Sequence, residues 1–297
     1  MTESSREQWL PWLMLGVLAL IWGSSFILIK LGLKVYGPGE VGALRIVAAG
    51  IFLAPLSIPK LLKLKPKQWG ILFLIGLVGS FIPAFLFALA QTRIPSGIAG
   101  VLNATTPIFT LIIGAIFFAT VITRRAAIGI FIGFVGVTVL IMSGEGENIW
   151  EKFSPYALFV VLATVCYGIN VNVIKAYVSN ISPITITGVS LLLVLPIAAV
   201  YLFGFTEFTY KLQNVEGAGM SLLFVALLGV MGTALALIMF NRLVQIKTPV
   251  FAASVTYLIP IVALIWGLWF DEKILWGHVV GMVGILMGVY IANRRKG

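Results

Sequence analysis

Residues 22–30 read Trp22-Gly23-Ser24-Ser25-Phe26-Ile27-Leu28-Ile29-Lys30, and a related stretch begins at residue 167. That second stretch reads Tyr167-Gly168-Ile169-Asn170-Val171-Asn172-Val173-Ile174-Lys175. In this register an aromatic residue falls on an aromatic residue, a glycine on a glycine and a lysine on a lysine. The match continues beyond the next loop, where Pro38 corresponds to Pro183. A register kept across a helix, a loop and the next helix start predicts two copies of one unit.

The composition predicts a polytopic membrane protein. Of the 297 residues, 60% are hydrophobic and only 10% are charged, whereas a soluble domain carries about 25% charged residues. The charged residues also lie between long apolar runs. The single cysteine, Cys166, excludes an internal disulfide.

Ten apolar segments are long enough to cross a bilayer, which takes about 20 helical residues. We expect the spans at 12–35, 39–58, 69–91, 96–120, 125–142, 155–178, 183–203, 219–243, 248–270 and 274–292. The fold class is therefore all-α.

Charge orients these spans. Basic residues concentrate around 60–67, 124–125 and 242–247 and in the tail 294–296, whereas acidic residues concentrate around 145–151, 207–216 and 271–272. With ten spans, each set falls on one side of the membrane. The positive-inside rule then places the basic loops and both termini in the cytoplasm.

The later spans also repeat. In the fourth span Asn103 and Pro107 match Thr256 and Pro260 of the ninth, and the glycine spacing of the fifth span returns in the tenth. Since the unit has five spans, an odd number, the two copies sit upside down relative to each other. We expect inverted five-helix repeats at 1–147 and 148–297, an arrangement typical of carriers with a site near the midplane.

These residues resemble EamA-type permeases of the drug/metabolite transporter superfamily. The resemblance rests on Trp-Gly-Ser-Ser-Phe at 22–26, Arg45, the prolines of the fourth and ninth spans, and Tyr257-Leu258-Ile259-Pro260 leading to Asp271-Glu272. It covers 12–292 and implies a ten-helix exporter that moves small metabolites, often amino acids, without ATP. The family tends to place Glu after the fourth and ninth spans. Glu272 fits, but 119–123 contains no acid.

Two faces are candidates for substrate binding. Trp22 and Ser25 lie three residues apart and share a helix face, as do Tyr167 and Asn170. An aromatic ring beside a hydrogen-bonding group suits a ligand that stacks and exchanges hydrogen bonds. The alternative is close helix packing through small residues.

Polar residues beside prolines form a second candidate group: Asn103, Thr106, Thr256 and Tyr257. A proline frees a backbone carbonyl, and irregular backbone within a membrane must be buried or face a cavity. The alternative is a kink whose hydroxyl groups satisfy the backbone.

Arg45 lies about six residues, or roughly 9 Å, into the second span. A carboxylate-bearing substrate would be a natural partner for it, although Glu40 is close enough in sequence to pair with it instead. Lys30 and Lys175 lie near helix ends, where lysines reach the interface; a gating role is the alternative.

We therefore predict a multi-pass permease of the cytoplasmic membrane that exports a small organic metabolite, such as an amino acid, by alternating access. We expect no catalytic residues, metal, cofactor or nucleic-acid partner, because the chain lacks a phosphate-binding Gly-Lys-Ser/Thr loop and a His/Cys cluster. The partners are the substrate and the lipid bilayer, with a homodimer left open. The alternatives are a membrane scaffold or sensor and an integral-membrane enzyme. The expected substrate-binding residues are Trp22, Ser25, Arg45, Asn103, Thr106, Tyr167, Asn170, Thr256 and Tyr257.

Overall fold

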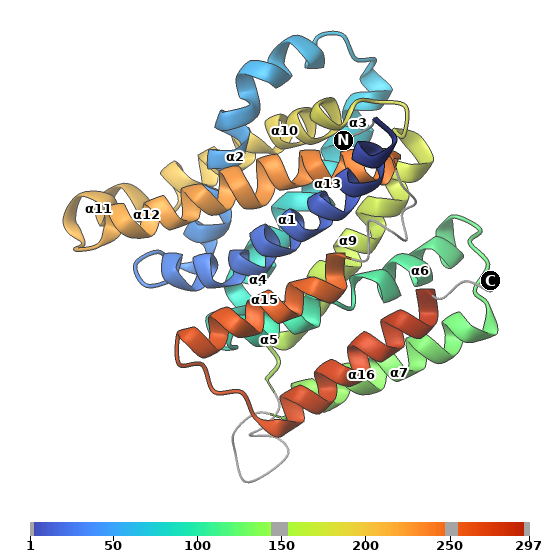
Figure 1. Ribbon diagram of the computed structural model, residues 1–297. Coiled ribbons are helices and arrows are strands. Elements are labelled where there is room, and N and C mark those ends of the chain that lie inside the picture. Colours follow the sequence, from blue (N-terminus) through green and yellow to red (C-terminus); the bar gives the residue numbers. More distant parts are fainter. Residues whose placement is uncertain (1–2, 144–153, 247–254, 294–297) are drawn as a thin grey trace.

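A computed structural model describes residues 3–143, 154–246 and 255–293, and every regular element in these ranges is a helix (Figure 1). The first part contains α1 (Glu3–Gly32), α2 (Pro38–Leu61), α3 (Pro66–Gly76), the π-helical segment η1 (Leu77–Phe81), α4 (Ile82–Ala90), α5 (Ser96–Asn103), α6 (Thr106–Phe117) and α7 (Arg124–Ile141). The second part contains α9 (Ala157–Tyr177), α10 (Pro183–Gly204), α11 (Phe208–Asn214), α12 (Ala218–Leu227), the π-helical segment η2 (Leu228–Leu235), α13 (Ala236–Ile246), α15 (Val255–Trp269) and α16 (Trp276–Asn293).

The helices are those of a multi-pass membrane protein. In the described ranges, seven helical spans are long and apolar enough to cross a bilayer, and two shorter apolar helices run over Leu258–Trp269 and Trp276–Gly288. All of them lie where the sequence predicts spans. The short helix α11 lies between the predicted spans 183–203 and 219–243, where the sequence predicts no helix.

Local sequence sets several helix starts. Pro38, Pro66 and Pro183 occupy the first position of α2, α3 and α10, where a missing N–H costs nothing and the fixed φ suits a helix. Thr123 and Ser182 cap α7 and α10 by accepting hydrogen bonds from the backbone N–H groups of Ala126 and Thr185.

The third and eighth predicted spans each contain a π-helical turn, at η1 and η2. Glycines precede and occupy these turns because groups of other helices approach closely there. A Cβ added to Gly229 would lie 2.6 Å from the backbone carbonyl oxygen of Arg45, and one added to Gly79 would lie 2.8 Å from the side-chain amide of Asn170. The π turn also shifts the hydrogen-bond ladder, which is common at functional sites.

Equivalent helices of the two parts make equivalent contacts. α2 packs along α10 and α7 along α16, while α1 packs on α15 as α9 packs on α6. The α7–α16 pair lies at one side of the bundle (Figure 1). Its contact is close because Gly136 faces Gly284: a Cβ on Gly284 would lie 2.9 Å from the Gly136 Cα. These glycines of α7 and α16 therefore pack against each other within the chain.

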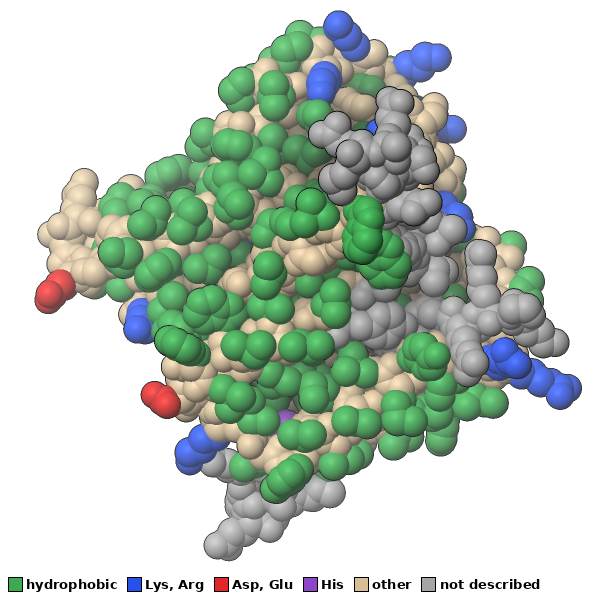
Figure 2. All heavy atoms as spheres, in the orientation of Figure 1, with side chains coloured by type: hydrophobic (Ala, Val, Ile, Leu, Met, Phe, Trp, Pro, Cys, Tyr) green, Lys and Arg blue, Asp and Glu red, His purple; other side chains and the backbone are tan. Residues whose placement is uncertain are grey.

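The two ends of the bundle differ in charge. One end, here the Glu272 end, gathers the connections 33–37, 91–95, 205–217 and 270–275; there Tyr36 donates to the Ala218 carbonyl (3.0 Å) and Lys211 pairs with Glu40 (2.8 Å). The opposite end, here the Lys60 end, holds the connections 62–65, 118–123 and 178–182. In Figure 2 lysines and arginines gather along the upper and right edges, whereas the acidic side chains in view lie at the left together with further basic side chains.

Candidate functional site

Trp22 and Ser25 of α1 face the π-helical segment η2. The Trp22 indole N–H donates to the carbonyl oxygen of Gly232 (2.9 Å), and its ring lies 5.3 Å from that of Phe240. Ser25 is buried and donates to the Ile21 carbonyl (2.9 Å). A Cβ on Gly232 would lie 2.8 Å from the Ser25 hydroxyl oxygen. Both predicted residues therefore lie against one glycine at mid-depth.

Tyr167 and Asn170 of α9 repeat this arrangement in the other part of the chain. The Tyr167 ring stacks on Phe87 of α4 with ring centroids 6.1 Å apart. Asn170 is buried against Gly79 of η1, as Ser25 is against Gly232. The two motifs found in the sequence thus make matching contacts across the two parts of the chain. The motif of α1 contacts η2, and the motif of α9 contacts η1.

Arg45 does not pair with Glu40. Its Nε donates to the Thr233 hydroxyl of η2 (2.7 Å). Glu40 instead accepts from Lys211 Nζ (2.8 Å) and from the Gly37 N–H (2.6 Å). Glu40 lies in the first turn of α2, more than one turn from Arg45, and it forms an ion pair with Lys211 of α11 instead. Within the described ranges Arg45 has no acidic partner closer than 4.0 Å.

Asn103 and Thr106 flank a break in the fourth predicted span, since α5 ends at Asn103 and α6 begins at Thr106. The Thr106 hydroxyl donates to the Asn103 carbonyl (2.8 Å), so here a hydroxyl satisfies the freed backbone, as the alternative reading expects. Thr105 in the break bonds Thr164 of α9 (3.1 Å). Thr256 is buried on α15, whereas the Tyr257 side chain lies outside what the structure describes.

Two candidate side chains keep unused hydrogen-bonding capacity. The amide oxygens of Asn103 and Asn170 are buried and have no partner among the described residues. A buried acceptor without a donor costs about 1–3 kcal/mol. Such atoms are suited to accept hydrogen bonds from a bound molecule.

A charged cluster that the sequence did not reveal closes the Glu272 end. The Glu272 carboxylate accepts from Lys30 Nζ (2.8 Å), the Ser96 hydroxyl (2.7 Å) and the backbone N–H groups of Ser96 and Gly97 (both 3.0 Å). Lys30 therefore makes an ion pair and does not simply reach water. The sequence showed Glu272 after the ninth span and Lys30 at the end of the first. Their separation in the sequence gave no indication that the two side chains are in contact.

Burial of Glu272 by itself raises the pKa of its carboxyl, but the hydrogen bonds from Gly97, Lys30 and Ser96 outweigh burial and lower the pKa below its ordinary value. The group is therefore ionised at neutral pH. It also occupies the start of α5, where free N–H groups and the helix dipole favour an anion.

Other parts of the described chain contribute less to a site. His278 accepts a hydrogen bond from the Leu275 N–H through Nδ1 (3.1 Å). No group of three His, Cys, Asp or Glu side chains is placed to hold a metal within the described ranges. Two apolar surface grooves, one on α10 and one between α1 and α15, contain none of the candidate residues.

Long apolar helices with arginine, tyrosine, tryptophan and amide groups among them define a multi-pass membrane protein. The chain belongs to the EamA-like transporter family, whose model matches residues 9–142 and again 154–294.

Relatives of known name agree with this assignment. The chain is 28% identical to an uncharacterised transporter of Archaeoglobus fulgidus over 96% of this chain and 99% of that protein. It is 26% identical to a probable amino-acid metabolite efflux pump of Escherichia coli strain K12 over 93% of each chain. A solved structure described as "Crystal structure of protein" shares the fold, with a TM-score of 0.64, 16% identity and coverage of 98% of this chain and 97% of that one.

Proposed function

We propose that this protein is a secondary transporter that exports a small organic metabolite across the cytoplasmic membrane by alternating access. In this proposal ten helices form two inverted five-helix repeats, 1–147 and 148–297, with both termini in the cytoplasm. The observation that carries the proposal is the matched pair of aromatic and polar motifs. The motif on α1 lies against η2, and the motif on α9 lies against η1. Inverted repeats give one sequence two near-equivalent packings, open to opposite sides.

The substrate would lie between the two motifs, near Arg45. An intramembrane arginine without an acidic partner is costly, so such a residue is retained where it serves a function. The Thr233 hydroxyl binds only the Nε of Arg45 and leaves the rest of the guanidinium available. The two terminal nitrogens of the guanidinium suit a carboxylate, which they bind in a bidentate manner. Trp22, Ser25, Thr106, Tyr167, Thr256 and Tyr257 would complete the lining with Asn103 and Asn170.

An amino acid fits this set of groups. Its carboxylate would bind Arg45, and its ammonium would donate to the unpartnered amide oxygens of Asn103 and Asn170. The efflux pump named above carries an amino-acid assignment, which supports the same class of substrate. The site would need neither a metal nor a cofactor.

The first experiment measures transport by purified protein in proteoliposomes loaded with a panel of radiolabelled amino acids. We expect release of at least one of them by the wild type and a loss of about 100-fold in Arg45→Gln, because a charge-assisted bidentate contact is removed. Trp22→Ala and Asn170→Ala should also lose transport while they remain monodisperse in detergent.

The matched control is Arg242→Gln, which removes the same charge from an exposed position of α13. It should transport like the wild type. If Arg45→Gln and Arg242→Gln both retain wild-type rates on every transported amino acid, Arg45 does not bind the substrate. If no amino acid is released by the wild type, the scaffold or sensor alternative gains support.

A further inference from the structure

One face of α1 carries a site residue, an aromatic ring and a charge in succession. Trp22, Phe26 and Lys30 are spaced four residues apart, about 6 Å for each step. The matching face of α9 carries Tyr167, Val171 and Lys175. Each set runs from the candidate site toward one end of the bundle: the α1 set toward the Glu272 end and the α9 set toward the Lys60 end.

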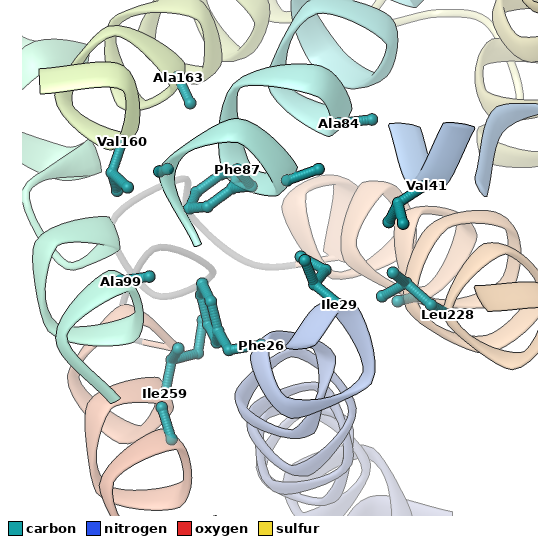
Figure 3. Packing of buried hydrophobic residues seen from close by; sticks show 14 of the residues in the cluster. Phe26, Ile29, Val41, Ala84, Phe87, Ala99, Val160, Ala163, Leu228 and Ile259 are labelled. Atoms are coloured by element: carbon teal, nitrogen blue, oxygen red, sulfur yellow. The ribbon is translucent and has the colours of Figure 1, made fainter. Parts of the chain in front are cut away.

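Phe26 lies between the candidate site and the Glu272 end. It meets Phe87 of α4 edge-on, with ring centroids 5.6 Å apart, and the two side chains are only 5% and 3% exposed. Figure 3 shows both rings projecting into the space between α1 and α4, with Ala99 of α5 and Ile259 of α15 beside them. An interlocked pair of aromatic rings excludes water and adds about 0.5–1.5 kcal/mol beyond its area.

Lys30 forms a charged latch one turn beyond this layer. Its ion pair with Glu272 joins the end of α1 to the turn after α15, and Glu272 also holds the start of α5. The Glu272 side chain is only 3% exposed, whereas that of Lys30 is 39% exposed. Charge-assisted hydrogen bonds are about twice as strong as those between neutral groups.

The Lys60 end has the same construction without the charge. Thr120 corresponds to Glu272: each follows a residue with positive φ, Ala119 (53°) or Asp271 (55°). Each also donates its backbone N–H to a glycine carbonyl, Gly114 (3.0 Å) or Gly267 (2.9 Å). Thr120 cannot pair with Lys175, which is exposed and makes no ion pair among the described residues.

The aromatic layer is also weaker at the Lys60 end. Phe240 packs on Trp22 as Phe87 packs on Tyr167, but the position matching Phe26 is Val171. Val171 and Phe240 are both only partly buried, whereas Phe26 and Phe87 are buried. Among the described residues, the aromatic packing on the Lys60 side of the candidate site is therefore less tightly buried.

We propose that the two ends of this transporter are gates of unequal strength: Phe26, Phe87 and the Lys30–Glu272 latch close the Glu272 end, so the resting protein opens toward the Lys60 end. Thr120 and Val171 are the two positions that leave the second gate weak. The inference rests on the proposed alternating access, but it concerns gating and not the identity of the substrate.

The test uses accessibility to an impermeant maleimide and needs no substrate. Cys166→Ala removes the only thiol, and Asn170→Cys places a smaller reporter at mid-depth. Labelling is measured in vesicles of both orientations. We expect the reporter to label at least fivefold faster from the Lys60 side, and Lys30→Met to raise labelling from the Glu272 side about fivefold, the shift expected for one ion pair.

Lys34→Met is the control for this variant, because Lys34 is an exposed lysine just beyond the end of the same helix; it should change nothing. Lys30→Met labelling no faster than Lys34→Met from the Glu272 side would overturn the latch. This variant leaves Glu272 to cap α5, so the helix start is preserved.

A substitution that strengthens the gate at the Lys60 end gives an independent test, because it adds a contact and removes none. Thr120→Glu changes an exposed position and supplies the missing partner of Lys175. We expect it, alone or with Val171→Phe, to slow labelling from the Lys60 side about fivefold. Adding Lys175→Met should reverse that effect. Unchanged labelling in Thr120→Glu would show that the gates do not differ for the reason given. Failure of either gate test leaves the Arg45 transport experiment unaffected.

Discussion

At the scale of single residues, Arg45 is the most informative side chain of the candidate site. Its backbone carbonyl lies against Gly229 and its Nε donates to the Thr233 hydroxyl, and both of these residues belong to η2. The segment η2 therefore holds the arginine in one direction. A fixed guanidinium loses less side-chain entropy when it binds an anion than a free one does.

Thr233→Val tests this positioning. The substitution keeps the shape of the side chain but removes the hydroxyl that accepts from Arg45 Nε. We expect the KM for the transported substrate to rise about tenfold, as for a lost hydrogen bond to a charged group. Thr233→Ser should restore the wild-type KM. Concentration-dependent uptake distinguishes these cases, and an unchanged KM in Thr233→Val would mean that Arg45 is held by other contacts.

The spacing of residue types in the sequence indicated which candidate side chains share a helix face, but it did not indicate their hydrogen-bond or ion-pair partners. Trp22 with Ser25, and Tyr167 with Asn170, were recognised because three-residue spacing gives a common helix face. The partners of Arg45 and Lys30 could not be read from the sequence, since Thr233 and Glu272 come from the distant second half of the chain. The alternative in which Arg45 pairs with Glu40 is not what the structure shows, because Lys211 of α11 binds Glu40.

At the scale of helices, close backbone contacts through glycine shape the bundle. Gly136 of α7 faces α16 so closely that a Cβ would lie 2.8 Å from the Gly281 carbonyl oxygen. In a membrane such contacts matter because lipid tails are as apolar as leucine, and packing must supply the attraction between helices.

Gly136→Leu should therefore push α7 away from α16. We expect the free energy of unfolding in detergent to fall by about 1–3 kcal/mol, the usual cost of overpacking. Gly70→Leu is the control, because a Cβ on exposed Gly70 of α3 meets nothing within 4 Å. Thermal unfolding followed by gel filtration compares the two variants. Equal melting temperatures would show that the α7–α16 contact tolerates added volume.

The predicted spans match the helices in place but not in internal form. Hydropathy detects the length of an apolar run, so it located 69–91 and 219–243 correctly. It carries no signal for a shifted hydrogen-bond ladder, and η1 and η2 were missed. The break between Asn103 and Thr106 was foreshadowed by Pro107, because proline removes one helical hydrogen bond.

At the scale of the whole molecule, the placement of charge implies a defined orientation. Lysines and arginines without acidic neighbours gather along the upper and right edges of the molecule in Figure 2. A bilayer around the apolar middle would keep this basic end in the cytoplasm.

Reporter fusions test that orientation. We expect a fluorescent protein at the C-terminus to fluoresce in a bacterial host, and alkaline phosphatase inserted in the 205–217 connection to be active, because phosphatase needs an exported position. The reciprocal fusions should be inactive. Active phosphatase at the C-terminus would reverse the proposed orientation and would turn the inferred resting state toward the other compartment.

The unequal sealing of the two ends also limits what this protein can do. A latch that is present in every cycle returns on closing the free energy that it costs on opening, so it cannot drive a solute uphill. The latch determines only which side of the membrane the substrate-free protein faces. Thr120 and Val171 would therefore change the speed of turnover in each direction while the final concentration ratio stayed fixed by the gradients outside the protein.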